Sequence, residues 1–421
     1  LKINSVSPES QNDTSNSTTE SATTKNKFPI RRLHWALLTI CLIIIYLPSI
    51  GAPFVYDDKI EVIGNPTIRF LEEWKAILLY NPSRLLLQTS YALNFHFGTF
   101  DPFTYHVSNL AIQCITAASS FFFIEQLLLL FRKKQALVWA GLLSTIWILH
   151  PMGTESVSYI TGRSESFAAL FSILALGFYA KGLRSKKPLF QGLAWFSTLL
   201  ALGVKEIAVV LPLVFLWMEY CLPNHQLSKR KLLPVLLFFA LGFGIRFFIV
   251  SNENPNGSII LLLQSLLPNE VNRPLLTQLN TQMEVWLRYA ALWIFPYQQT
   301  IFHHIPDLDP FSVKGVGIFV AWITILGLGF KFARKHPLAL FALGAAILFL
   351  LPSSSFAALK ENMAEHRSHQ FGLFFLLFLG SFLNHKSISW KIAPVFAVVL
   401  SLLTYQRNQV WNSEVRLWQE A

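Results

Sequence analysis

Charged residues are scarce in this chain. Asp, Glu, Lys and Arg together make up 14% of its 421 residues, whereas they account for about 25% of a typical soluble domain. Hydrophobic residues make up 53% and recur in long, almost uncharged runs. Such runs are long enough to cross a bilayer as helices, and they are not expected in an ordinary soluble domain. The sequence therefore predicts an all-α polytopic membrane protein.

Cysteine is also rare, and no spacing typical of a metal site is present. Cys41, Cys114 and Cys221 lie in or beside apolar runs and form no CxxC pair. We therefore expect inert helix residues, not a zinc site or a disulfide framework. The adjacent His303 and His304 precede two aspartates, but neighbouring histidines rarely reach the same ion. We predict that the protein needs no metal and no cofactor.

The net charge of +11 could indicate a nucleic-acid partner in a soluble protein. Here the basic residues cluster in short segments between apolar runs, which is the positive-inside pattern of membrane proteins. We therefore predict no nucleic-acid partner and place these segments on the cytoplasmic side. The basic segments are residues 31–32, 132–134, 181–187, 229–231, 331–335 and 386–391.

Placing the basic segments inside fixes the side on which every other connection lies. The apolar runs then give about eleven transmembrane helices. Their predicted ranges are 33–50, 104–131, 135–150, 157–180, 189–204, 207–222, 232–250, 313–330, 337–352, 369–384 and 390–405. Two amphipathic stretches, 68–99 and 258–297, are predicted to lie on the extracytoplasmic side as surface helices or re-entrant elements.

The sequence predicts three parts along the chain. Residues 1–30 are rich in Ser, Thr and Asn, so we expect a disordered cytoplasmic tail. Residues 31–405 form the transmembrane domain, with extracytoplasmic loops at about 51–103 and 251–312. Residues 406–421 follow the last span, which places the C-terminus outside.

Polar residues gather in the connections that this topology places outside. In HPMGTESVSYITGRSE (150–165), Glu155, Tyr159 and Arg163 are spaced i, i+4 and i+8, which predicts one helix face. Arg163 and Glu165 would then lie about two turns inside the membrane. Charges at that depth are costly and commonly functional. The alternative is a structural Arg–Glu pair that locks two helices.

Further charged residues on the outer side are candidates for holding an anion. Lys205 lies between two apolar runs and needs a negative partner, either the adjacent Glu206 or a bound phosphate. Glu365, His366 and Arg367 open another apolar run. An arginine at that position can hold a phosphate bidentately.

Two adjacent carboxylates, Asp57 and Asp58, follow the first predicted span. Together with the outer basic residues they suit a transferase whose donor is a lipid phosphate. Fixed positive charge stabilises a phosphate leaving group, and a carboxylate can take the proton of an acceptor hydroxyl. Either aspartate could be the base. His150, which precedes a proline, could be a helix cap or a catalytic residue.

Several motifs resemble one family in their order along the chain. They are YDDKIEVIGNP (56–66), residues 82–113, residues 150–165, KEIAVVLPL (205–213) and EHRSHQFGLFF (365–375). They resemble the membrane domain of the TPR-containing GT-C glycosyltransferases, in the protein O-mannosyltransferase superfamily. The resemblance covers about residues 30 to 421, and residues 406–421 look like the usual lead-in to TPR repeats.

The resemblance implies an inverting transfer of a sugar, usually mannose, from a polyprenyl-phosphate donor to a hydroxyl of an acceptor such as protein Ser or Thr. It matches the base to Asp57, with Asp58 beside it. It also matches the family's GR-E stretch to Arg163 and Glu165, and its EHR stretch to residues 365–367. The donor phosphate would be held by outer basic residues, for which the candidates are Arg163, Lys205, Arg246 and Arg367.

Two other functions stay open at this point. The same fold could glycosylate a lipid or a cell-wall glycan. An ion-coupled transporter could use the charges at residues 163, 165, 205 and 206, although transporters commonly show internal repeats and midplane sites, which this sequence lacks. We expect a bacterial inner membrane with a periplasmic site, or, in a eukaryote, the endoplasmic reticulum membrane with a lumenal site.

Overall fold

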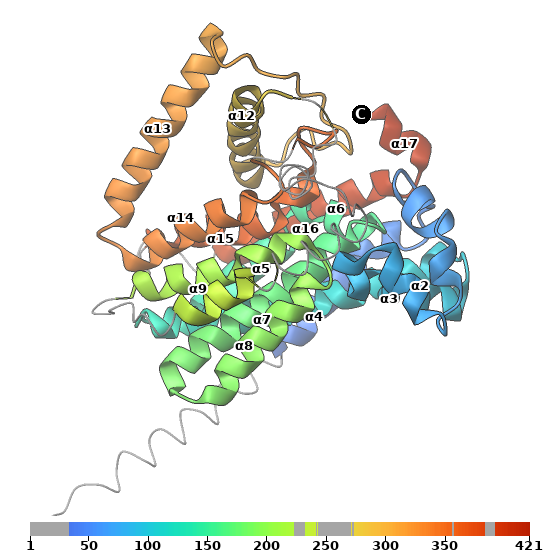
Figure 1. The fold of residues 1–421 in the computed structure, drawn as a ribbon, viewed down its shortest axis with the longest axis horizontal. Coiled ribbons are helices and arrows are strands. Elements are labelled where there is room, and N and C mark those ends of the chain that lie inside the picture. The colour runs from blue at the N-terminus through green and yellow to red at the C-terminus, as the bar shows by residue number, and fades with distance from the viewer. Residues whose placement is uncertain are drawn as a thin grey trace, which may run out of the picture.

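The computed structural model in Figure 1 describes residues 33–222, 232–240, 242, 271, 273–355, 358–383 and 392–421. Within these residues the secondary structure is helical and contains no strand, so the all-α prediction is confirmed for this part. The predicted tail 1–30, the candidate Arg246 and the first part of the amphipathic stretch 258–297 lie outside the described residues.

The centre of the fold is a bundle of apolar helices that pack along one another. Its members are α4 (Pro102–Leu130), α5 (Ala136–Ile148), α7 (Arg163–Ser185), α8 (Pro188–Leu202), α14 (Pro337–Leu350) and α15 (His369–Ser381). The helix Leu33–Ser49 precedes them in the chain. The remaining helices are α2 (Trp74–Tyr80), α3 (Leu85–Gly98), α6 (Glu155–Ser158), α9 (Leu211–Tyr220), α12 (Leu275–Ile294), α13 (Val313–Ala333), α16 (Ile392–Trp411) and α17 (Glu414–Gln419).

Local sequence signals set where several helices begin. Asp101 caps α4 by accepting a hydrogen bond from the backbone N–H of Phe103, and Pro102 follows it. Ser312 caps α13 in the same way, through the N–H of Gly315. Proline is favourable in the first helical turn because its missing N–H would be unpaired there in any case. These caps explain why the predicted starts at 104 and 313 lie within a few residues of the observed ones.

Among the described residues, three helices are long and apolar enough to cross a membrane: α4, α7 and α13. A fourth span is possible if α5 and the segment Pro151–Ser158, which are bent by 62°, count as one. The other described segments that were predicted to span are helical but shorter or less apolar, so the count of about eleven stays a prediction. Figure 1 shows α13 standing away from the bundle, and its apolar surface is almost entirely exposed.

The helices of the bundle share two ends of opposite character. At one end the N-termini of α4 and α7 meet, where Arg163 donates to Asn109. At the other end Arg184 of α7 donates to Gln126 of α4, so α4 and α7 run parallel. We call the first end, which carries Asp57, the turn 159–162 and Glu365, the polar end. The second end carries the connections 131–135, 186–187 and 334–336, and we call it the basic end.

The prediction of one continuous helix from residue 157 is wrong. Helix α6 ends at Ser158, Tyr159 has an extended backbone (φ −81°, ψ 122°), and α7 begins only at Arg163. Glu155, Tyr159 and Arg163 therefore do not share a helix face, and Arg163 lies at a helix start. The chain can turn this tightly because Gly162 has no side chain: a Cβ there would lie 2.2 Å from the carbonyl oxygen of Glu155.

This close approach predicts a cost for Gly162→Ala. We expect the substitution to lower the free energy of unfolding by about 1–3 kcal/mol, because the added methyl group must displace backbone. Gly192→Ala in α8 is the matched control, since a Cβ there meets nothing within 4 Å, and alanine is the better helix former by about 1 kcal/mol. Thermal unfolding in detergent, followed by tryptophan fluorescence, measures both. Equal midpoints for the two variants would contradict the tight turn.

Candidate functional site

The two aspartates that follow the first helix have different surroundings. Asp58 is fully buried, and its carboxylate accepts hydrogen bonds from the backbone N–H groups of Val55 (3.1 Å) and Thr161 (2.8 Å). Burial raises the pKa of Asp58 to about 7, although both hydrogen bonds act in the opposite direction. Asp58 therefore fastens the loop 55–58 to the turn 159–162.

Asp57 is exposed, and within the described residues its carboxylate has no hydrogen-bond or ion-pair partner. Its position is fixed through the backbone, because its N–H donates to the hydroxyl oxygen of Tyr159 at 2.9 Å. The preceding residue, Tyr56, has a positive φ of 48°, a conformation that costs a non-glycine residue about 1–2 kcal/mol. Strained backbone of this kind often marks a functional site.

Contacts of the Tyr56 side chain stabilise that conformation. Its hydroxyl donates to the carboxylate of Glu361, and its ring meets Trp418 of α17 edge-on at 5.9 Å. Arg367 in turn donates to the carbonyl oxygen of Glu361 at 2.8 Å. The loop that carries Asp57 is thereby linked to the segment before α15.

A small hydrophobic cluster, which we call the loop cluster, lies beneath these contacts. Tyr159 stacks on Trp411, with ring centroids 5.8 Å apart, and Lys59 forms an ion pair with Glu414 of α17 at 2.7 Å. Helix α16 thus continues past the predicted domain limit at 405 and helps to hold the site loop. The loop cluster consists of Val55, Tyr159, Ile301, Trp411 and Leu417.

Two further carboxylates at the polar end hold backbone segments in place. Glu155 accepts from both the backbone N–H and the ring Nδ1 of His366, each at 2.9 Å. Glu365 is buried and accepts from the backbone N–H of Thr300 and from His303 Nε2, again at 2.9 Å each. Because all four contacts use the carboxylate oxygens, the geometry favours a positioning role for both residues.

Lys205 and Glu206 point to different partners. Lys205 Nζ donates to the buried carboxylate of Glu165 at 2.6 Å. Glu206 forms a bidentate ion pair with Arg84, with N–O distances of 3.0 and 3.1 Å. The second carboxylate oxygen of Glu165 is buried without a partner among the described residues. Lys205 therefore pairs with residue 165 and not with its neighbour in sequence.

Two cations act electrostatically on His366, namely Lys205 and Arg367, the next residue in the chain. Burial is the main cause that lowers the pKa of His366 to about 4, and the charges of these two cations act in the same direction. The His366 ring lies 6.4 Å from that of Tyr159, whose hydroxyl contacts Asp57. Asp57, Tyr159 and His366 are thus neighbours, and the charges of two partly exposed cations act on His366.

Arg163 is fully buried at the start of α7. Its guanidinium donates to the side chains of Asn109 and Ser90 and to the carbonyl oxygen of Tyr105, and it lies 4.9 Å from the ring centroid of Tyr91. These neighbours satisfy the charge without a carboxylate. The geometry favours a packing role for Arg163, in place of contact with a donor phosphate.

His150 is a helix cap in this structure. Its Nδ1 accepts from the backbone N–H of Met152 at 3.3 Å, and its ring stacks on Trp293 with centroids 4.5 Å apart. The geometry therefore favours the role of His150 as a helix cap over a catalytic role. Among the described residues, no group of three or more His, Cys, Asp or Glu side chains is arranged to hold a metal ion.

Three residues that the sequence did not single out belong to the site. Tyr56 and Glu361 bond to each other, and Trp411 stacks on Tyr159. Their only signal in the sequence is local: Tyr56 stands directly before the aspartates, and Glu361 lies four residues before the EHR stretch. The long-range pairing of residues 56 and 361 follows from the fold alone.

The chain is similar to several protein O-mannosyl-transferases. One from Caenorhabditis elegans is 26% identical over 409 residues, which cover 91% of this chain and 56% of the relative. One from Xenopus laevis is 27% identical, over 51% of this chain and 29% of its own length. One from Mus musculus is 26% identical, over 46% of this chain and 23% of its own length. These names confirm the resemblance seen in the motifs.

The chain spans just over half the length of the relative from Caenorhabditis elegans and less than a third of the other two. No protein-family model matches it, and no solved structure matches it significantly.

The buried Asp58 predicts a pH dependence of stability. Its folded pKa of about 7 lies above its ordinary value of 3.8. Its contribution to the free energy of unfolding is therefore full below about pH 4 and is lost as the pH rises through 7. We expect the thermal midpoint of the wild type to fall between pH 5 and 8 by more than that of Asp58→Asn. Glu72→Gln, at an exposed carboxylate that does not contribute to the raised pKa of Asp58, should show the same dependence of the midpoint on pH as the wild type. Parallel slopes in all three proteins would show that Asp58 does not titrate there.

Proposed function

We propose that this chain is a membrane glycosyltransferase domain that moves mannose from a polyprenyl-phosphate donor to a hydroxyl group of a protein. The relatives' names support the sugar and the protein acceptor. The apolar helices support an enzyme that meets a lipid-linked substrate in the membrane. The observation that carries the proposal is the exposed carboxylate of Asp57, which has no partner among the described residues and lies at the same end of the bundle as the partly exposed cations of Lys205 and Arg367.

In the proposed reaction Asp57 is the base. The acceptor oxygen forms a bond to C1 of the sugar, and its proton passes to the Asp57 carboxylate. The bond between C1 and the phosphate oxygen breaks, and its electron pair leaves with the polyprenyl phosphate. Attack opposite the leaving group inverts the configuration at C1. Asp58 supports this role by its two backbone hydrogen bonds, which keep its neighbour facing outward.

The phosphate that leaves gains negative charge, so cations near it lower the barrier. Among the described residues, Lys205 and Arg367 are the best-placed candidates, because both are partly exposed at the same end of the bundle as Asp57. Lys205 also pairs with Glu165, and Arg367 also pairs with Glu361. The unpartnered oxygen of Glu165 could accept a hydrogen bond from a sugar hydroxyl. Arg163 supports the site indirectly, because its hydrogen bonds hold the start of α7 against α3 and α4.

The gathering of basic connections at the end opposite Asp57 supports the proposed orientation. The site would then lie on the extracytoplasmic side, which is the lumen of the endoplasmic reticulum in a eukaryote or the periplasm in a bacterium. No step of the proposed reaction requires a metal ion or a cofactor.

The first test is Asp57→Asn. The purified full chain is reconstituted in proteoliposomes with polyprenyl-phosphate mannose labelled in the sugar and a Ser/Thr-rich acceptor peptide. Loss of the base should lower the transfer rate about 10²- to 10⁴-fold. Glu72→Gln, which neutralises another exposed carboxylate of the same outer stretch, should leave the rate unchanged.

Other outcomes of that assay would overturn parts of the proposal. Equal rates for Asp57→Asn and the wild type would exclude Asp57 as the base. Label that moves only to a lipid or glycan acceptor would exclude the protein acceptor. A wild type that leaves the label on the donor, with every lipid-linked sugar offered, would reject the transferase and favour transport.

The second test separates phosphate binding by Lys205 from its pairing with Glu165. Lys205→Gln should raise the KM for the donor about tenfold, since one charged contact is worth roughly 1.4 kcal/mol. It should also lower the thermal midpoint, because Glu165 is left buried and unpaired. The double variant Lys205→Gln/Glu165→Gln should recover the midpoint but not the KM. Arg84→Gln, which breaks the exposed pair with Glu206, is the control and should keep the wild-type KM.

Recovery of the wild-type KM in the double variant would contradict the phosphate-binding role. Lys205 would then be only the structural partner of Glu165.

A further inference from the structure

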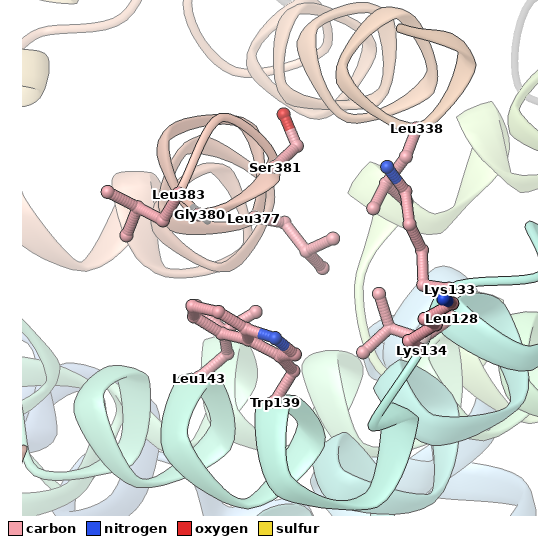
Figure 2. Close-up of a pocket in the computed structure, with 10 residues that line it drawn as sticks. All are labelled: Leu128, Lys133, Lys134, Trp139, Leu143, Leu338, Leu377, Gly380, Ser381 and Leu383. Carbon is pink, nitrogen blue, oxygen red and sulfur yellow. The ribbon is translucent and has the colours of Figure 1, made fainter. Parts of the chain in front are cut away.

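A small cavity lies at the basic end of the bundle, far from the site described above. It is bounded by the turn between α4 and α5, the first turn of α14 and the last turn of α15 (Figure 2). Helix α4 has 29 residues, so its two ends are about 40 Å apart. The cavity adjoins Leu128 near the C-terminal end of α4, whereas Asn109 contacts Arg163 near the other end. It is therefore a separate feature of the fold.

One side of the cavity is positively charged. Lys133 and Lys134, in the turn after α4, contribute to its lining, and Figure 2 shows both on the same side. Within the described part of the chain neither ammonium group has an ion-pair or hydrogen-bond partner. No residue that lines the cavity is acidic. Two unpaired cations beside a hollow without carboxylates would bind an anion.

The rest of the lining is apolar. Trp139 of α5 forms one wall, and Leu377 and Leu383 lie opposite it, at the end of α15 (Figure 2). Near this lining, His336 before α14 and Phe382 after α15 meet edge-on, with ring centroids 5.5 Å apart. Tryptophan and lysine beside apolar helix surface are typical of the level where lipid headgroups lie. A soluble anion would leave this apolar lining without a partner, whereas a lipid would cover it.

The volume fits a headgroup and excludes a whole lipid. The cavity measures about 70 Å³, several times the roughly 10–15 Å³ that one ordered water requires. A phosphate group can enter, and acyl chains must lie outside, along the apolar surfaces of α5 and α15. Basic pockets between transmembrane helices on the cytoplasmic side are a known way to hold anionic headgroups.

We propose that this cavity binds the phosphate of an anionic phospholipid from the leaflet at the basic end, through Lys133 and Lys134. The bound lipid would bridge the α4–α5 turn and the ends of α14 and α15. The turn and α14 already contact each other through Phe131 and Phe341 (6.1 Å between centroids). This site does not depend on the proposed transfer reaction, because it takes a different lipid at the opposite end of the bundle.

The experiment measures thermal stabilisation of the purified full chain in neutral detergent micelles. Three probes are titrated separately: dioleoyl phosphatidylglycerol, dioleoyl phosphatidylcholine and inorganic phosphate. The variants are Lys133→Gln/Lys134→Gln, which removes the two charges, and Ser381→Phe, which fills the cavity and keeps them. The matched control Lys331→Gln/Lys335→Gln removes two exposed charges from the same end of the bundle that do not line the cavity.

We expect only phosphatidylglycerol to raise the wild-type midpoint. The half-saturating concentration should rise at least about tenfold in Lys133→Gln/Lys134→Gln, since each lysine near a headgroup contributes about a factor of five. It should rise similarly in Ser381→Phe and stay within about twofold in the control. The proposal fails if phosphatidylcholine or free phosphate stabilises the chain equally. It also fails if Ser381→Phe binds as the wild type does, or if the two lysine double variants respond alike.

Discussion

The two hydrogen bonds that Asp58 accepts hold the polar end of this protein together. A buried carboxylate is costly unless it is well bonded, and this one uses both oxygens to join the loop 55–58 to the turn 159–162. The turn 159–162 sets the residue at which α7 begins and the position of Tyr159. The outward position of Asp57 and the stacking of Tyr159 on Trp411 both follow from this one contact.

The charged residues of the polar end divide into those that build the site and those left available for chemistry. Glu155 and Glu365 each hold a backbone segment and a histidine, and Arg163 is enclosed by α3 and α4. What remains partly accessible is Asp57, Lys205 and Arg367. A base and two cations of this kind are what transfer from a phosphate leaving group needs.

Charge also distinguishes the two ends of the bundle. At the polar end charges form internal pairs such as Arg84–Glu206 and Lys205–Glu165, although the side chain of Lys205 stays partly exposed. At the basic end, Lys133 and Lys134 lack partners among the described residues and face a hollow with apolar walls. Unpaired cations at a membrane surface attract anionic headgroups, whereas paired charges at the other end hold the segments around the exposed carboxylate of Asp57. The two ends therefore suit the two different lipids proposed above.

The sequence by itself determined the helical class and the approximate position of most described helices, because apolar runs and caps are local signals. It predicted that Asp57, Lys205 and residues 365–367 lie on one side of the membrane, and the fold places them at one end of the bundle. It could not tell Asp57 from Asp58, because only the fold buries one and exposes the other. It misjudged the helix through Tyr159, since the break at Gly162 depends on contacts with Glu155 and Asp58. Which charges pair, and which stay free to act, was decided by the tertiary structure, because pairing depends on distances between segments far apart in the chain.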